Sequence, residues 1–257
     1  MKIKVIEKQK DRIVFILEGT TEAMANTIRR VALNEVPTLA IEHVTMQRNS
    51  SALYDEVLAH RLGLIPLKTD LKSYRLQEDC VCKGKGCAQC TLTLTLKAKG
   101  PATVYSGSIE SKDPKVVPAY DKMVVVKLLK DQEIRVEATA ILGRGKTHMK
   151  FSPGLIFYHG HPTITIEKKS GIKACVEGAN NNLVEKGNEL IIKDISKWNE
   201  AHEEMCEKNG MKVTASKKNF IMSLESWGHL SPKEILMTAT DIVDRKLDEF
   251  AKQFKKI

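Results

Sequence analysis

The chain has 257 residues, of which 42% are hydrophobic and 28% charged, and its formal net charge at pH 7 is +9. These values are ordinary for a soluble globular protein, and no stretch approaches the roughly 20 consecutive apolar residues that a membrane-spanning helix needs. Residues 1–6 alternate in polarity, so we expect no signal peptide and a cytoplasmic protein. The positive charge favours an acidic partner or nucleic acid, although a lysine-rich solvated surface explains it equally well.

Strand and helix patterns alternate in the first part of the chain. A helix over 22–36 is expected to end before Pro37. A shorter helix over 54–62 is expected to end with Gly63 in a left-handed conformation. Three strands complete this part, at 2–7, 12–18 and near 38–48.

The middle of the chain is expected to be rich in strands, at 92–97, near 122–130 and at 133–142. The last two would pair as a hairpin about Asp131-Gln132. His159 and His161 precede Pro162, and we interpret this run as a turn rather than as a pair of metal ligands. Residues 168–215 are polar and loosely patterned, which suggests an insertion with little core of its own.

The last part of the chain carries the clearest helix signal. Ser231 is a candidate N-cap, Pro232 suits the first helical position, and Glu234 completes a capping box. The helix is expected to run to Lys256. Its apolar residues recur at spacings of three and four, and they are Leu236, Ala239, Val243, Leu247, Phe250 and Phe254. Such a seam packs either on the protein's own core or on another subunit, and both interpretations remain open.

Four of the six cysteines fall within a short run with the spacing C-x-C-x4-C-x2-C, and they are Cys80, Cys82, Cys87 and Cys90. Four thiolates on one glycine-containing loop can close around a zinc ion and leave no open position for catalysis. The run therefore predicts a structural zinc site, and Lys83 and Lys85 would offset its negative charge. A metal-free or disulfide-bonded loop and an iron–sulfur cluster are the alternatives.

Cys175 and Cys206 stand apart from this run. They are either small buried side chains or a disulfide of the kind that hyperthermophiles form inside cells. The run at 143–147 suggests a phosphate-binding loop but lacks its first glycine, because Ala140 occupies that position. No other catalytic pattern is present, so we expect no catalytic residues in this chain.

Several segments together resemble the alpha-like subunits of DNA-directed RNA polymerases, and the likeness is greatest to the alpha-like subunits of archaeal enzymes. The segments are 19–33 continuing to 59–67, 146–153, 226–235 with the helix that follows it, and the cysteine run. They cover most of the chain in the order that the family has.

The resemblance implies an α+β fold with a discontinuous dimerisation domain, formed by 1–48 and 216–257. A mostly-β insert domain would occupy 49–167 and carry the zinc loop 80–90. Residues 168–215 would be a reduced form of the ferredoxin-like insertion of many archaeal members. This insertion offers only Cys175 and Cys206, so we expect no iron–sulfur cluster and allow for a disulfide between the two.

The function that the resemblance implies is that of a non-catalytic assembly subunit. Such a subunit pairs with the small subunit L, and the pair recruits the large catalytic subunits and small zinc-bearing subunits of the polymerase. DNA and RNA would be met only through the assembled complex, and no membrane is involved. The expected interface residues are Met24, Ile28, Arg29, Arg30, Val31, Leu236, Val243, Leu247, Phe250 and Phe254. The rival interpretations are a stand-alone zinc-dependent nucleic-acid-binding module and a redox protein that uses its cysteines.

Overall fold

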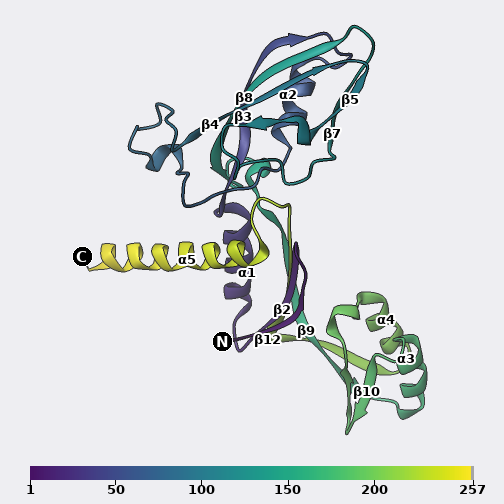
Figure 1. The fold of residues 1–257 in the computed structure, drawn as a ribbon. Helices are drawn as coiled ribbons and strands as arrows, with labels where there is room; N and C mark the ends of the chain where they lie inside the picture. Colours follow the sequence, from purple (N-terminus) through teal and green to yellow (C-terminus); the bar gives the residue numbers. More distant parts are fainter. Residues whose placement is uncertain (256–257) are drawn as a thin grey trace. The chain divides into compact units, whose positions relative to one another are not determined.

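The computed structural model describes residues 1–255, and the chain divides into two compact units. The first unit combines 1–29 with 156–224. The second combines 30–155 with the segment that begins at Glu225. The chain passes through each unit twice, as the colours of Figure 1 show. Each unit is therefore assembled from segments that are distant in the sequence.

The first unit is built on long and short strands in one sheet. In spatial order these are β1 (Lys2–Lys8), β2 (Arg12–Glu18), β12 (Met211–Ser226), β9 (Gly154–Ile166), β11 (Glu189–Ile192) and β10 (Leu183–Lys186). The expected strands at 2–7 and 12–18 are confirmed as the antiparallel pair β1 and β2. Two short helices, α3 (Ile172–Gly178) and α4 (Glu200–Lys208), complete the unit.

The expectation that 168–215 has little core is wrong. This segment contributes most of the buried cluster of the first unit, namely Cys175, Ala179, Leu183, Leu190, Ile195, Trp198, Cys206 and Met211. They pack with Ile164 and Ile166 of β9 and with Val14 and Ile16 of β2. Each short element supplies only one or two apolar side chains, so no periodic pattern long enough to recognise arises in the sequence.

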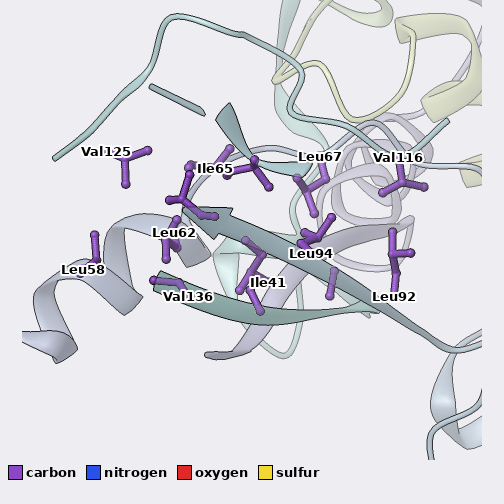
Figure 2. Close-up of a cluster of buried hydrophobic side chains, with 14 of the residues drawn as sticks. Ile41, Leu58, Leu62, Ile65, Leu67, Leu92, Leu94, Val116, Val125 and Val136 are labelled. Carbon is purple, nitrogen blue, oxygen red and sulfur yellow. The ribbon is translucent and has the colours of Figure 1, made fainter. Parts of the chain in front are cut away.

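The second unit contains a larger and a smaller sheet. The larger has the order β3 (Pro37–Asn49), β8 (Glu133–Arg144), β4 (Thr91–Lys99) and β6 (Glu110–Ser111), and the smaller pairs β5 (Ala102–Tyr105) with β7 (Val124–Leu128). Helix α2 (Asp55–Gly63) contributes Leu58 and Leu62 to the core of this unit. Figure 2 shows these two side chains in one cluster with Ile41 and Val136 of the sheet. The alternation predicted at 92–97 is confirmed, because Leu92, Leu94 and Leu96 are buried.

The predicted hairpin between 122–130 and 133–142 is wrong. The turn itself forms, since Asp131 has a φ of 63° and the Gln132 amide donates to the Leu129 carbonyl at 3.2 Å. Strand β8, however, pairs with β3 on one edge and β4 on the other, whereas β7 pairs with β5. Both edges of β8 are thus occupied by strands that are remote in the sequence.

Two smaller expectations also differ from the structure. Gly63 is the last residue of α2 and does not have the expected left-handed conformation. The helix ends instead at Leu64, whose amide donates to the carbonyls of His60 and Arg61. The expected turn at 159–162 is part of strand β9. A side chain at Gly160 would lie 2.6 Å from the Ser216 carbonyl oxygen, so this glycine allows β9 and β12 to approach closely.

Two longer helices complete the fold. Helix α1 (Glu22–Asn34) ends two residues earlier than expected, and its buried residues are Ala25, Ile28, Val31 and Ala32. Helix α5 (Pro232–Phe254) begins with the predicted capping box between Ser231 and Glu234. It buries Ile235, Ala239 and Ile242. The expected helix end at Lys256 lies outside the described residues.

Candidate functional site

The four clustered cysteines lie in one loop of the second unit, before β4. Their Sγ atoms all lie within 4.8 Å of one another. The Sγ–Sγ distance is 3.5 Å for Cys80–Cys82, Cys80–Cys87 and Cys82–Cys90, and 3.9 Å for Cys87–Cys90. Four sulfurs placed tetrahedrally at about 2.3 Å from a zinc ion are about 3.8 Å apart. The arrangement therefore fits a four-coordinate metal ion and is too wide for disulfide bonds.

The backbone of the loop explains why these four residues meet. Lys83, Gly84 and Gly86 have φ values of 52°, 78° and 82°, so the chain reverses sharply between the two cysteine pairs. The Cys87 amide lies 3.3 Å from the Cys90 Sγ, and the Cys90 amide donates to the Cys87 carbonyl at 2.9 Å. An amide that points at a sulfur stabilises negative charge there, which favours the thiolate form that a metal requires.

Charge is distributed unevenly over the four thiols. Burial opposes ionisation of Cys82, but its contacts with the Cys80, Cys90 and Cys87 thiols outweigh burial and lower its pKa to about 6. Burial raises the pKa of Cys90 to about 12, because it outweighs the opposite effect of the Cys87 amide. The loop thus favours ionisation of Cys82 and opposes that of Cys90, and a bound cation would offset the cost of the second negative charge.

The loop exposes an apolar tip beside the cysteines. Val81 is 80% exposed, and Lys83 and Lys85 near it are exposed as well. Cys80 and Cys90 are buried at the base of the loop. A metal ion held there would fix the shape of this tip. With all four ligand positions taken by the protein, the site would have no position for a reacting group.

The far half of α5 is the second candidate site. All residues from Asp244 to Lys255 are exposed, and they include Leu247 at 61%, Phe250 at 65% and Phe254 at 67% exposure. The rings of Phe250 and Phe254 lie side by side, with 5.9 Å between their centroids. In the part of the chain that the structure describes, nothing covers these side chains. Three large apolar residues on one exposed helix face are typical of a protein-binding surface.

The other residues expected at the interface have different surroundings. Leu236 and Val243 are partly buried, as is Met24. Ile28 and Val31 are only 7% and 8% exposed, so they have little free surface to offer a partner. The side chain of Arg29 donates to Asn26 Oδ1 at 2.8 and 3.1 Å, and Arg30 is exposed.

An ion pair fixes α5 beside the residue that follows α1. Lys246 Nζ lies 2.7 Å from Glu35 Oε1. This hydrogen bond is the largest influence on Glu35 and lowers the pKa of its carboxyl. Nearby, a cleft of about 550 Å3 is lined by α5 and by the segment that leads into the cysteine loop, including Tyr74 and Arg75. Arg144 in the same cleft pairs with Glu78.

Cys175 and Cys206, which the sequence left open, form a disulfide between α3 and α4. Both residues are completely buried, and their separation in the sequence is 31 residues. Among the described residues, His159 and His161 are not part of any group of three or more candidate metal ligands. The four cysteines of the loop are the group that meets this criterion. Burial is the main cause that lowers the pKa of His159.

One surface feature had no signal in the sequence pattern. It is a hollow of about 480 Å3 in the second unit, whose lining includes Leu64, Tyr120, Met149, Trp227 and His229. Its walls come from loops and segment ends, where no periodicity reveals which side chains are exposed. His229 is buried there, and burial lowers its pKa to about 4.

Comparison with known proteins gives a consistent result. Residues 40–156 match the family described as the RNA polymerase Rpb3/RpoA insert domain. The DNA-directed RNA polymerase subunit Rpo3 of Methanosarcina acetivorans is 37% identical over 97% of this chain and 96% of its own length. The subunits Rpo3 of Archaeoglobus fulgidus and Pyrococcus horikoshii are each 36% identical, over 99% and 100% of this chain and 98% and 99% of their own lengths. Among the described helices, none is long and apolar enough to cross a membrane.

Proposed function

The chain belongs to the Rpo3 family of DNA-directed RNA polymerase subunits, and from this premise we propose that it takes the place of the alpha-like subunit in an archaeal enzyme. It is an assembly subunit without catalytic residues. It forms a heterodimer with the small subunit L, and this pair is the platform for the large catalytic subunits. Nucleotidyl transfer belongs to the complex, in which this chain positions other subunits and holds no reacting group.

The observation that carries this proposal is the uncovered apolar seam of α5. Leu247, Phe250 and Phe254 are 61%, 65% and 67% exposed on the far half of α5, whereas the first half of the same helix buries Ile235, Ala239 and Ile242. Permanent complexes bury large apolar surfaces of this kind, and an isolated chain that leaves them free tends to associate or precipitate. Leu236 and Val243 extend the seam toward the start of α5.

Helix α1 supplies the remaining contacts in this proposal. Met24 is partly buried and Arg30 is exposed, so both keep surface that a partner can reach. Arg29 is held by Asn26, which fixes the position of its guanidinium group. Ile28 and Val31 contribute mainly by keeping the helix packed within the chain, because little of their own surface is free.

The metal loop serves assembly rather than chemistry. We place one zinc ion on Cys80, Cys82, Cys87 and Cys90, where it supplies a closed tetrahedral cross-link between the two cysteine pairs. The cross-link holds Val81 and its neighbouring lysines in a fixed position. A zinc-bearing small subunit or the second-largest subunit docks against this tip.

The proposed domain boundaries are set by the role of each segment in assembly. The dimerisation domain comprises 1–48 and 216–257, the insert domain 49–167, and the reduced insertion 168–215. The family match over 40–156 overlaps most of this insert domain. The compact units divide at other positions, because they reflect which segments pack together rather than which segments bind partners. The insertion carries the disulfide and, in this proposal, no iron–sulfur cluster.

The interface is tested by replacing Leu247 and Phe250 with Asp and co-expressing the chain with subunit L. Both residues are exposed in the free chain, so its thermal midpoint should change by less than about 2 °C. In the complex the two carboxylates would be buried without partners, which costs several kcal/mol and should abolish co-purification.

A matched control is Val184→Asp with Ile191→Asp. These residues lie opposite each other on β10 and β11 and are 46% and 44% exposed, so the change in polarity and charge is similar. The control chain should retain subunit L. Undiminished binding of subunit L by the α5 variant would show that the seam is not the interface. Salt-sensitive binding of DNA or RNA by the isolated chain would instead favour the nucleic-acid-binding alternative.

A further inference from the structure

A polar pocket of about 320 Å3 lies in the first unit, within the insertion 168–215, and the proposed function does not use it. Its walls are the turn at 180–182 after α3, the segment 193–197 after β11, and His202 of α4. Among the described lining residues, Ala179 is the single hydrophobic one. The remaining lining consists of amide, charged and imidazole side chains, so the pocket suits a polar ligand.

The walls of this phosphate-sized pocket are joined to one another. The disulfide between Cys175 and Cys206 ties α3 to α4, which lie next to each other in Figure 1, and Cys206 follows His202 by one helical turn. Asn182 links the other two walls, because its Nδ2 donates to the Asp194 carbonyl at 2.8 Å and its Oδ1 accepts from the Asp194 amide at 2.9 Å. A pocket whose walls are fixed in this way loses little conformational entropy when a ligand binds.

The imidazole of His202 offers the pocket a hydrogen-bond donor. Its ring lies against the buried ring of Trp198, with 5.4 Å between the centroids. Its Nδ1 is the single buried side-chain nitrogen or oxygen of the described residues that has no hydrogen-bond partner. A buried N–H without an acceptor is the rarer and costlier arrangement, so the proton of the neutral ring belongs on Nε2. Nε2 makes no hydrogen bond with a described residue, and its N–H is therefore free for a ligand.

The charges of the lining favour an anion. Lys193 Nζ donates to the Asn181 carbonyl at 2.8 Å, and Lys197 Nζ lies 3.2 Å from Asp194 Oδ2. The other oxygen of Asp194 accepts from the amide and hydroxyl of Ser196 at 3.1 and 2.6 Å, and these hydrogen bonds are the main cause that lowers the pKa of the carboxyl. Two ammonium groups thus face one carboxylate that the chain's own donors already occupy. A cation would find no free ligand oxygen on this carboxylate, whereas an anion meets a surplus of one positive charge.

The donors are distributed over three walls, which favours phosphate over a carboxylate. Asn180 and Asn181 have left-handed backbones, with φ values of 51° and 57°, and their carboxamides make no hydrogen bond within the described residues. They line one wall, the two lysines line the second, and His202 lines the third. The acceptor oxygens of a phosphate group point in different directions, whereas those of a carboxylate lie in one plane. A phosphate group can therefore accept from all three walls at once.

We propose that this pocket binds a phosphate group, carried by inorganic phosphate or by a small phosphate ester. The ammonium groups of Lys193 and Lys197 supply the positive charge, and the Nε2–H of His202 supplies a neutral donor. The site goes beyond the proposed function, because it belongs to the first unit, whereas the cysteine loop and the exposed seam of α5 belong to the second. Its success or failure is thus independent of whether the chain binds its proposed partners.

The test is a titration of the full chain with sodium phosphate at neutral pH and constant ionic strength, followed through the imidazole nitrogens by NMR. The signals of His202 are assigned as those lost in a His202→Gln variant. The 15N shifts of the free chain should show the proton of His202 on Nε2, and phosphate should shift this signal saturably, whereas chloride should not. A parallel titration with glycerol phosphate distinguishes the two sources, because the tighter ligand is the one that the pocket fits.

Variants of exposed or partly exposed residues locate the site. Lys193→Glu should weaken phosphate binding at least about tenfold, whereas Lys186→Glu, the same charge change on exposed β10, should leave it within about twofold. In calorimetry, His202→Gln retains an N–H donor and should bind within about threefold of the natural chain, whereas His202→Leu should lose about tenfold.

Three results would each overturn the proposal. One is the absence of a saturable shift with either phosphate compound. Another is an equal loss of binding in the Lys186 control, which would mean that the basic chain attracts anions without a site. The third is full phosphate binding by His202→Leu. Trp198 fluorescence checks that each variant keeps the core of the first unit, since Trp198 is buried there.

Discussion

The disulfide between Cys175 and Cys206 should provide a large part of the stability of the first unit. Replacing both residues with Ala opens a loop whose ends are 31 residues apart. On the chain-entropy estimate, closing a loop of this length stabilises the folded state by about 3.7 kcal/mol at 25 °C. This is comparable to a quarter or more of the total stability of most small domains. The loss should be confined to the unit that contains the disulfide.

The two tryptophans of the chain allow the units to be followed separately. Trp198 is buried in the core of the first unit, whereas Trp227 belongs to the second. In a Trp227→Phe background, urea unfolding followed by tryptophan fluorescence reports the first unit alone. With a urea dependence of about 1.5 kcal/mol per M, the midpoint should fall by about 2.5 M in the Ala variant. In a Trp198→Phe background, the fluorescence of Trp227 should report a shift of less than about 0.3 M by the same relation.

The single variants provide the decisive control. Either Cys175→Ala or Cys206→Ala alone opens the loop, so each should cost nearly as much as the double variant. If the two single losses instead add up to the double loss, the stabilisation comes from local packing of each side chain and the loop-closure argument fails. A midpoint shift below about 0.5 M in the double variant would have the same consequence.

Three further predictions concern the second unit. Mass spectrometry of the purified protein should find one zinc ion per chain. Replacing Cys82 and Cys90 with Ser should remove this zinc, and a variant that still binds zinc would contradict the proposed site. His229 has a pKa of about 4 in the folded chain, below the value of about 6.5 expected in the unfolded chain. Below pH 6.5 protonation therefore favours the unfolded chain, so the contribution of the neutral imidazole to the free energy of unfolding is complete above pH 6.5 and is lost as the pH falls toward 4. Stability should drop by roughly 3 kcal/mol over that range, and His229→Gln should flatten this profile in urea titrations. Lys246→Ala should cost less than about 1 kcal/mol of unfolding free energy, because the Lys246 side chain is 53% exposed, and a larger loss would show that the pair is coupled to the packing of α5.

Features that depend on neighbouring residues were predictable from the sequence. The capping box at Ser231 and Glu234, the alternation at 92–97 and the spacing of the four cysteines each depend on a few consecutive positions. Their physical causes are equally local, since a helix cap, a strand face and a four-thiolate loop are formed by side chains that the chain already holds near one another.

Features that depend on remote segments have no signal in the local sequence pattern. The sequence pattern pairs β8 with the strand that precedes it in the chain, although β3 and β4 occupy both of its edges. No local pattern indicates the core formed by 168–215, because Val14 and Ile164 from other parts of the chain complete it.

The sequence by itself determined the chemistry of this protein: four thiols for a metal, an amphipathic terminal helix and no catalytic pattern. Only the tertiary structure decided which apolar residues remain free. Ile28 and Leu247 have the same apolar character in the sequence, but one is 7% exposed and the other 61%. The difference arises because burial depends on which remote segment packs over a residue, and no local pattern contains that information.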